Sequence, residues 1–492
     1  MKRELKRTRP GARIIMGMGW MLLAGLAVGP ATAANWTGGG GEDRDWSNAD
    51  NWDTGVPTAS VLANIGTTSK QLGQAVLTQP GAVCVRLHLA RVANTTGELE
   101  ILSGDLTAGS SQSDWGHSGG KAIVTIRGGS LTVGNLYGND CTVTQEAGVV
   151  TLSGLLGNAS GYHSRYVLLD GELYSPATIA NGGAATILQS GGTNTLRATT
   201  YFAKGVGGAT PSYSSCRYAL SGGVLNLAGD AAILGGGGTG QFGAGMLHLG
   251  GGSVVSTNGS SLTIRNQAGA YGRIRGWGAV NGIGMFTMNG QTIADGGGTN
   301  RTLAIAFNTL ANGIANTAAG TNGWFAVNGG RLELPPLDVT GNGTTIWGET
   351  GTAVAAAFDL VNAVAFAFSG VAGNGTLAGA LCASERADVP KQIRASRVIG
   401  MWNFVAEGFS STHVELTVRY DHTAAAALGL TEEDLQLFTH NGQPGGKWVP
   451  VETVVDTNLR TLTVTDLAYT PAYLAAGVDI QSTPQSTIML VR

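Results

Sequence analysis

The sequence predicts an all-β protein: a right-handed parallel β-helix, or β-solenoid, followed by a smaller β-sandwich-like domain. Three observations predict this fold. Glycine supplies 79 of 492 residues while charged residues make up only 12%, a strand–glycine–strand pattern recurs, and apolar residues alternate with polar ones. Because glycine costs about 1 kcal/mol at a helical position, this composition indicates short strands joined by tight turns. The apolar fraction of 43% is too high for a disordered chain.

The recurring pattern has a regular period. Strand-like runs end at one glycine or at a pair of glycines. The first glycines of these ends are 20 to 24 residues apart, at Gly104, Gly128, Gly148, Gly171 and Gly191. A period of this length is typical of one coil of a parallel β-helix, with three short strands and three bends. Glycine at a bend supplies positive φ and lets neighbouring coils approach closely.

Side chains alternate within the strands that follow these glycines. Apolar residues take the second and fourth places, at Leu131 and Val133, Val150 and Leu152, Leu225 and Leu227, and Leu332 and Leu334. A period of two places one set inside and the other outside. An antiparallel up-and-down protein is the alternative, because Asp170-Gly171 and Asn289-Gly290 would suit two-residue turns. The repeat spacing favours the solenoid.

Five segments follow from these patterns. They are a signal peptide (1–33), a Trp-rich N-terminal cap (34–80), the β-solenoid (81–350), a C-terminal β-sandwich-like domain (351–480) and a tail (481–492). A cap is expected because the end of a solenoid exposes a strand edge. Near residue 350 glycine becomes rarer, and short strand-like runs such as Phe366–Phe368 and Val414–Val418 follow at sandwich-like spacing.

The N-terminus predicts export. Six basic residues precede an apolar stretch from Ile14 to Val28, and Ala31-Thr32-Ala33 has the small-x-small pattern of a signal peptidase site. We therefore expect Sec-type bacterial export, a secreted or cell-surface location, and no membrane span in the mature chain. Without residues 1–33, 23 basic and 31 acidic residues remain, a net charge of −8. This balance disfavours nucleic acid and anionic lipid as partners.

No cofactor is expected from the sequence. The cysteines form no C-x-x-C pair, and we expect buried thiols at Cys84, Cys141, Cys216 and Cys382. A single structural calcium ion stays open as an alternative, with ligands at Asp43, Asp45, Asp50 and Asp53. Solvated turn residues are the simpler interpretation of these aspartates.

Catalytic motifs are weak. Gly116–Gly120 matches G-x-S-x-G around Ser118, but a strand rather than a helix follows, which does not suit a nucleophile elbow. Gly235–Gly240 matches G-x-G-x-x-G without a strand–turn–helix unit. A polysaccharide hydrolase would need two carboxylates at a fixed separation. The best candidate group for an enzyme is Asp295, Asn300 and Arg301, and no catalytic residue is assigned.

Aromatic residues suggest glycan binding as an intermediate hypothesis. Trp36, Trp46 and Trp52 are candidates for a surface that stacks on sugars, together with Trp115 and Trp277. The alternative is that the first three form the core of the cap. His88 and His248 lie in strand-like runs, and we expect them to be structural.

The cap sequence resembles a known group of proteins. Trp36-Thr37-Gly38, Trp46–Trp52 and Gly55-Val56-Pro57 are similar to the start of bacterial exported, autotransporter-passenger-like β-strand-repeat surface proteins. Later stretches resemble the same group, so that the resemblance extends over most of the mature chain: Arg273–Gly278, Asn289-Gly290, Ala294–Gly297, Asn322–Gly329 and Val418–Asp421. The resemblance implies a surface-associated role outside the cytoplasm and implies no chemistry. The chain departs from true autotransporters because the segment after residue 350 is too short for their membrane barrel.

Together these features predict a non-enzymatic secreted or cell-surface protein, structural or adhesin-like. The alternative is a carbohydrate-active β-helix protein, either a polysaccharide lyase or hydrolase or a glycan-binding module. The expected partners are envelope or extracellular polysaccharide, or other surface proteins.

Overall fold

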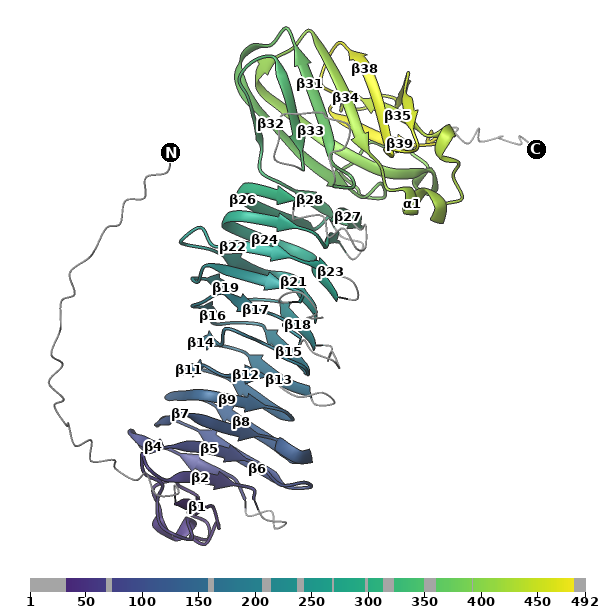
Figure 1. Cartoon of the computed structure of the whole chain (residues 1–492). Coiled ribbons are helices and arrows are strands. Elements are labelled where there is room, and N and C mark those ends of the chain that lie inside the picture. Colours follow the sequence, from purple (N-terminus) through teal and green to yellow (C-terminus); the bar gives the residue numbers. More distant parts are fainter. Residues whose placement is uncertain are drawn as a thin grey trace, which may run out of the picture.

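The computed structural model describes residues 32–67, 73–157, 163–205, 214–236, 243–267, 270–296, 300–312, 323–348, 360–391 and 393–481. The predicted signal peptide lies outside the described residues except for its last two positions, as does the tail from residue 482. The expectation of an all-β protein is confirmed. The described chain forms one large, mostly parallel sheet and a separate five-stranded sheet (Figure 1).

Most strands of the large sheet pair in parallel with the strand above and below them, in three ladders. The first ladder contains β3 (Ala75–Leu77), β6 (Thr96–Ile101), β8 (Lys121–Ile126), β10 (Cys141–Gln145), β13 (His163–Leu168), β15 (Ala184–Gln189), β18 (Ser214–Leu220), β21 (Gly243–Val255), β24 (Ala270–Met288), β25 (Gln291–Asp295) and β27 (Trp324–Asn328). The long strands β21 and β24 bend and continue into the other ladders.

The second ladder contains β4 (Ala82–Cys84), β7 (Asp105–Trp115), β9 (Ser130–Gly138), β11 (Val149–Leu152), β14 (Glu172–Ser175), β16 (Thr193–Leu196), β19 (Val224–Leu227), β26 (Thr302–Asn312) and β28 (Arg331–Glu333). The third contains β1 (Ala33–Asn35), β2 (Leu62–Ile65), β5 (Arg86–Leu89), β12 (Leu155–Leu156), β17 (Thr200–Tyr201), β20 (Ala231–Leu234) and β22 (Ser261–Ile264). Two short elements lie beside them, β23 (Asn266–Gln267) and the 3-10 turn η2 (His117–Gly119).

Burial follows the alternation read from the sequence. Leu131, Val133, Val150 and Leu152 are buried, whereas Thr132 between the first two is partly exposed. The same holds at β19, where Leu225 and Leu227 lie inside. The apolar side chains therefore form a continuous core between the ladders, and each fully buried leucine contributes about 1.5–3 kcal/mol.

A column of glycines marks the bend between the first and second ladders. Each has φ in the left-handed region, at Gly129, Gly148, Gly171, Gly192 and Gly223. A Cβ on Gly171 would collide with the carbonyl oxygen of Gly148, and the same collision recurs up the column. Glycine is required here because the backbones of successive rows approach too closely for any side chain.

Buried polar side chains join the rows at the same bend. The Gln145 amide donates to the carbonyl oxygens of Gly148 and Glu172 at 2.9 and 3.0 Å, and Tyr166 Oη donates to Gln145 Oε1 at 2.6 Å. Gln189 and Tyr218 repeat this arrangement two rows further along. These bonds tie the turn of one row to the strand of the next, and each satisfies a buried polar group.

The C-terminal part of the chain is antiparallel. In the large sheet it contains β29 (Leu337–Val339), β32 (Ala372–Cys382), β33 (Val398–Ser410), β35 (Gln436–His440), β36 (Val449–Val451) and β39 (Tyr473–Gly477), and β32 pairs with β28 of the second ladder. The five-stranded sheet contains β30 (Gly343–Trp347), β31 (Val364–Ser369), β34 (His413–Arg419), β38 (Thr461–Leu467) and β37 (Val454–Asp456). Strands β29 and β30 precede residue 350 but pair with strands that follow it.

Helices are short and few in the described chain. They are α1 (His422–Ala427), the 3-10 turn η2 named above, and the 3-10 turns η1 (Ala49–Asn51), η3 (Ala395–Arg397) and η4 (Glu432–Asp434). The Asp421 side chain accepts hydrogen bonds from the Thr423 and Ala424 amides and so caps α1. Within the described ranges, no helix has the length and apolar character needed to cross a membrane.

Candidate functional site

The three tryptophans of the N-terminal cap are buried. Trp36, Trp46 and Trp52 are 2%, 1% and 4% exposed, and the Trp52 ring packs edge-on against both others, with centroids 5.2 and 4.8 Å apart. Trp52 Nε1 donates to the Trp46 carbonyl oxygen at 2.8 Å. Their ring faces therefore lie in the core of the cap and not on a surface that a sugar could reach, which fits the core interpretation.

The two other candidate tryptophans lie elsewhere. Trp115 is buried on β7, and its Nε1 donates to the Leu87 carbonyl oxygen at 3.1 Å. Trp277 on β24 is partly exposed, and the Arg301 guanidinium covers its ring at 4.3 Å from the centroid. The five tryptophans do not form one exposed aromatic platform.

The aspartates of the cap hold its turns. Asp45 accepts hydrogen bonds from Ser47 and Thr78, and Asp53 accepts two from Asn35. Burial raises the pKa of Asp45, but the bonds from Ser47 and Thr78 outweigh it and hold that pKa below its usual value. Over the described ranges, no group of three His, Cys, Asp or Glu side chains is placed to hold a metal ion.

Asp295, Asn300 and Arg301 make no hydrogen bond or ion pair with one another in the described chain. Asp295 on β25 forms an ion pair with Arg275 at 2.7 Å and accepts from Asn328 at 3.1 Å. Asn300 Oδ1 accepts from the Ala387 amide at 3.4 Å, and Arg301 covers Trp277. Each side chain is engaged in a different structural contact.

Ser118 lies in the exposed turn η2. Its hydroxyl is 2.6 Å from Nδ1 of His117, and its φ of 55° is left-handed. The next element is strand β8, so the strand-to-helix elbow of a hydrolase is not formed. The other glycine motif, Gly235–Gly240, lies largely outside the described residues.

All four cysteines are buried and free. Burial raises the pKa of Cys84 to about 12 and those of Cys141 and Cys382 to about 11, and it raises the pKa of Cys216 further. Thiols with such pKa values stay protonated and unreactive at neutral pH. They pack as small apolar side chains.

His88 is a buried, neutral side chain. Its Nδ1 accepts from the Asp114 amide at 2.9 Å, and Arg91 Nε lies 3.3 Å from Asp114 Oδ2. Burial lowers the pKa of His88 to about 4; the Asp114 carboxylate opposes this shift, and Arg91 and Arg86 reinforce it. The ring therefore stays neutral in the folded protein while the unfolded chain takes up a proton near pH 6.5.

We expect this histidine to weaken the fold in acid. The contribution of His88 to the free energy of unfolding is fully present above pH 6.5. It falls by about 1.4 kcal/mol per pH unit as the pH decreases toward 4, which amounts to about 3 kcal/mol in all. Asparagine at position 88 keeps an acceptor for the Asp114 amide but does not titrate. Urea unfolding from pH 7 to 4.5 should show a shallower pH dependence for His88→Asn than for the wild type; identical slopes would contradict the assignment.

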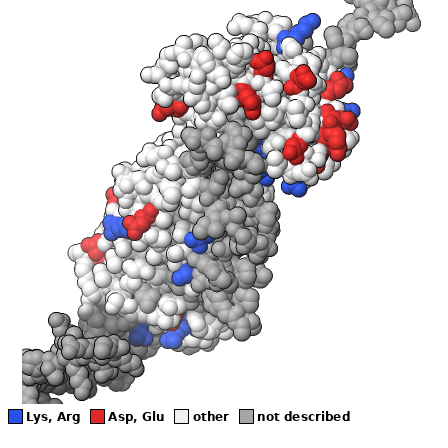
Figure 2. Space-filling model, turned by 45° about the horizontal axis from the view of Figure 1, so that its top comes forward, with Lys and Arg blue, Asp and Glu red and all other residues white. Residues whose placement is uncertain are grey.

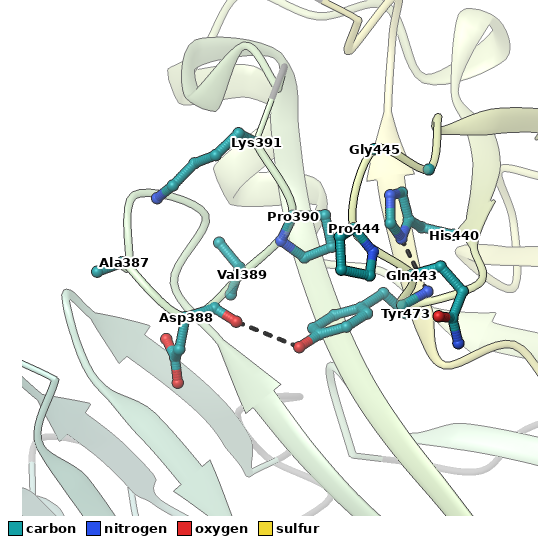
Figure 3. Close-up of a pocket in the computed structure, with 12 residues that line it drawn as sticks. Ala387, Asp388, Val389, Pro390, Lys391, His440, Gln443, Pro444, Gly445 and Tyr473 are labelled. Atoms are coloured by element: carbon teal, nitrogen blue, oxygen red, sulfur yellow. Dashed lines mark hydrogen bonds between the residues drawn. The ribbon is translucent and has the colours of Figure 1, made fainter.

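A pocket of about 340 Å³ opens on the antiparallel part of the large sheet (Figure 3). It lies between the segment 387–391 after β32, the 442–446 loop after β35, and Tyr473 of β39. Tyr473 Oη donates to the Asp388 carbonyl oxygen at 3.2 Å, and His440 Nδ1 accepts from the Gly442 amide at 2.9 Å.

The charged groups near this pocket are already paired. The buried Arg386 donates to both carboxylate oxygens of Asp388 at 2.8 and 2.7 Å, and this bond holds the pKa of Asp388 below its usual value. Lys391 Nζ donates to the Arg386 carbonyl oxygen at 3.0 Å. These contacts order the 386–391 segment, and Arg386 also donates to the Arg301 carbonyl oxygen at 2.9 Å, which fixes the segment to the parallel ladders.

A second pocket, of about 330 Å³, lies on the outer face of the first ladder. It extends over β13, β15, β18, β21 and β24, and its lining includes His163, Thr186, Arg217, Met246 and Arg273. His163 Nε2 lies within hydrogen-bond distance of Thr186 Oγ1, at 2.8 Å. Unlike the first pocket, it contains arginines that form no ion pair within the described chain.

Three arginines occupy one column of this face. Arg165 lies opposite Thr186, which lies opposite Arg217; Met246 and then Arg273 continue the column. Because neighbouring strands lie about 4.8 Å apart, the arginine backbones recur at about 10 Å. Sequence reasoning missed this column, although Arg165-Tyr166 and Arg217-Tyr218 form a repeated pair in which the tyrosine is buried.

Charge is distributed unevenly over the molecule. Figure 2 shows acidic side chains gathered on the C-terminal part and only scattered charges on the face of the parallel ladders in view. The strands β13, β15, β18, β21 and β24 contain no aspartate or glutamate. The column of arginines (Arg165, Arg217 and Arg273) therefore has no acidic residue on its own strands.

No protein-family model, curated protein or solved structure matches this chain. Its function must therefore be inferred from its own residues.

Proposed function

We propose that this protein is a non-enzymatic scaffold of the cell surface or extracellular space, built as a right-handed parallel β-helix with a β-sandwich-like domain at its C-terminal end. The three ladders support the β-helix, because the chain visits them in turn and then pairs with itself one row further on. Ile123 lies opposite Thr142, which lies opposite Arg165. Such stacking gives an elongated body with long lateral faces, suited to a structural or adhesin-like role.

Two antiparallel sheets support the sandwich. Phe366 of β31 packs edge-on against Phe404 of β33, with centroids 4.8 Å apart, and Phe368 packs against Phe409 at 5.3 Å. These contacts place apolar faces of the two sheets against each other, as in aligned β-sheet packing. The basic and apolar start of the chain and its similarity to exported repeat proteins support the location.

One observation carries the scaffold role: the residues singled out for chemistry are engaged in holding the structure. Asp295 pairs with Arg275, Arg301 covers Trp277, and the tryptophans of the cap form its core. A polysaccharide lyase or hydrolase would instead need acidic side chains directed together at a substrate.

The test is to incubate the mature chain with neutral and acidic polysaccharides and measure new chain ends. No new ends are expected above a control without protein. Release of new ends that Asp295→Asn abolishes would overturn the scaffold role and identify a polysaccharide-cleaving enzyme. Because Asp295 is partly exposed and pairs with one arginine, thermal unfolding of the variant must confirm that it remains folded.

A further inference from the structure

We propose that the outer face of the first ladder, from β13 to β24, binds an extended acidic polysaccharide whose chain runs across the strands, with one anionic group near each of Arg165, Arg217 and Arg273. This inference goes beyond the scaffold role and does not depend on it. It rests on the strand register of this face, on its arginines that form no ion pair in the described chain, and on the second pocket.

The register places the three arginines in one column of the sheet. Parallel pairing places Arg165, Arg217 and Arg273 in one column on every second strand, so their backbones recur at about 10 Å. Guanidinium groups bind carboxylates and sulfates through charge-assisted, often bidentate hydrogen bonds. A column of them with a constant repeat fits a polymer whose anions also recur at a constant distance.

These arginines are available to a ligand. Arg165 and Arg217 are exposed, and neither side chain forms a hydrogen bond or an ion pair within the described residues. Arg273 is partly exposed, and its Nε is buried without a hydrogen-bond partner in the described chain. By contrast, Arg127 elsewhere on the parallel ladders pairs with Glu100 and Glu146 at 2.6 and 2.9 Å.

The arginines of this face act on a neighbouring histidine. Burial lowers the pKa of His248, and the neighbouring Arg217 and Arg275 lower it further, while Asp295 opposes them. Asp295 is itself paired with Arg275. An anion would therefore meet uncompensated positive charge along the column.

The residues between the arginines suit a sugar chain. Thr186 lies between Arg165 and Arg217 and offers a hydroxyl group, while Met246 lies between Arg217 and Arg273 and offers an apolar contact. The small Ala184 and Ala244 leave the pocket open. Alternation of charged positions with polar or apolar ones corresponds to a polysaccharide in which acidic and neutral sugars alternate.

Charge spacing favours a polysaccharide over nucleic acid. Duplex DNA carries about one negative charge per 1.7 Å of its axis, and proteins that bind it neutralise many phosphates from a basic surface. Positive charges about 10 Å apart on a chain of net charge −8 after export would neutralise few of them. Sparse, evenly spaced carboxylates match the column better.

The experiment measures binding of the mature chain to hyaluronate, which carries one carboxylate per disaccharide, with neutral dextran and a short duplex DNA as comparison probes. Titration calorimetry at low salt should show binding to hyaluronate and none to dextran. The double variant Arg165→Gln/Arg217→Gln should weaken hyaluronate binding by about tenfold or more. Raising the salt concentration should weaken the wild type more than this variant.

The matched control is Arg127→Gln/Arg197→Gln. It also removes two positive charges from the parallel ladders, but Arg127 is held by two glutamates and Arg197 lies over the Tyr174 ring at 3.3 Å. Its hyaluronate affinity should match that of the wild type. Thermal unfolding should change little in both variants, because the substituted side chains are exposed and exposed ion pairs contribute little to stability.

Four results would overturn the proposal. They are no binding of hyaluronate by the wild type, equal binding of dextran, tighter binding of duplex DNA than of hyaluronate, and equal weakening in the two double variants. None of them bears on the scaffold role, which fails only if new polysaccharide ends are released.

Discussion

Replacing Gly171 by alanine is expected to lower the free energy of unfolding by about 3 kcal/mol or more. The φ of 88° at this position costs a residue with a Cβ about 1–2 kcal/mol, and the new methyl group collides with the carbonyl oxygen of Gly148. Backbone atoms cannot move aside as a flexible side chain can, so overpacking adds a further cost of about 1–3 kcal/mol. Urea unfolding followed by circular dichroism measures the loss.

Two other glycines separate the cost of the left-handed φ from the cost of the steric collision. Gly81 has a φ of 79° but open space where a Cβ would lie, and Gly341 has neither a left-handed φ nor a close neighbour there. Alanine at Gly81 should cost about 1–2 kcal/mol because of the φ alone, and alanine at Gly341 should cost almost nothing. A Gly171→Ala protein as stable as Gly81→Ala would show that successive rows leave room for a side chain at this bend.

Replacing Trp52 by alanine is expected to cost about 3–5 kcal/mol, as for other large buried aromatic side chains. The ring contacts Trp36 and Trp46 and donates a hydrogen bond to the Trp46 carbonyl oxygen. Because this cluster lies at the N-terminal end of the ladders, the loss should begin there as local unfolding. Limited proteolysis with N-terminal sequencing should detect early cleavage in the cap.

Phenylalanine at position 52 provides the control. It keeps one aromatic ring for packing but loses the N–H donor and the second ring, so the loss should be smaller than for alanine, about 1–3 kcal/mol. If Trp52→Ala resisted protease as well as the wild type, the cap would not depend on its aromatic core. An exposed glycan-binding surface would then be the better interpretation of these tryptophans.

Much of the fold was accessible from local sequence patterns. Period-two alternation at Leu131 and Val133 depends only on neighbouring residues, and so does the need for glycine at a bend such as Gly171. The predicted boundary at residue 350 follows a change in composition, whereas the strand pairing changes earlier: β29 begins at Leu337 and already pairs with β32. Composition does not report which strand a segment pairs with.

The candidate site was harder to predict because it depends on register between distant rows. Arg165 and Thr186 are fewer residues apart than Thr186 and Arg217, although both pairs are neighbours in the ladder. Because the loops between the rows differ in length, a search for a fixed sequence period does not find the column. Conversely, Asp295 and Arg301 are close in sequence, but Asp295 ends a strand of the first ladder and Arg301 precedes one of the second, so their side chains meet different partners.

The register of the parallel strands determines how loss or duplication of a sequence segment would change the length of the protein. Because Ile123 lies opposite Thr142 and Thr142 opposite Arg165, a segment that begins at one of these positions and ends just before the next contributes one strand to each ladder. Loss or duplication of such a segment would shorten or lengthen the body by one complete row and leave both ends intact. The molecule can therefore change its length in discrete steps of about 4.8 Å, while insertions of any other size must be accommodated in the bends.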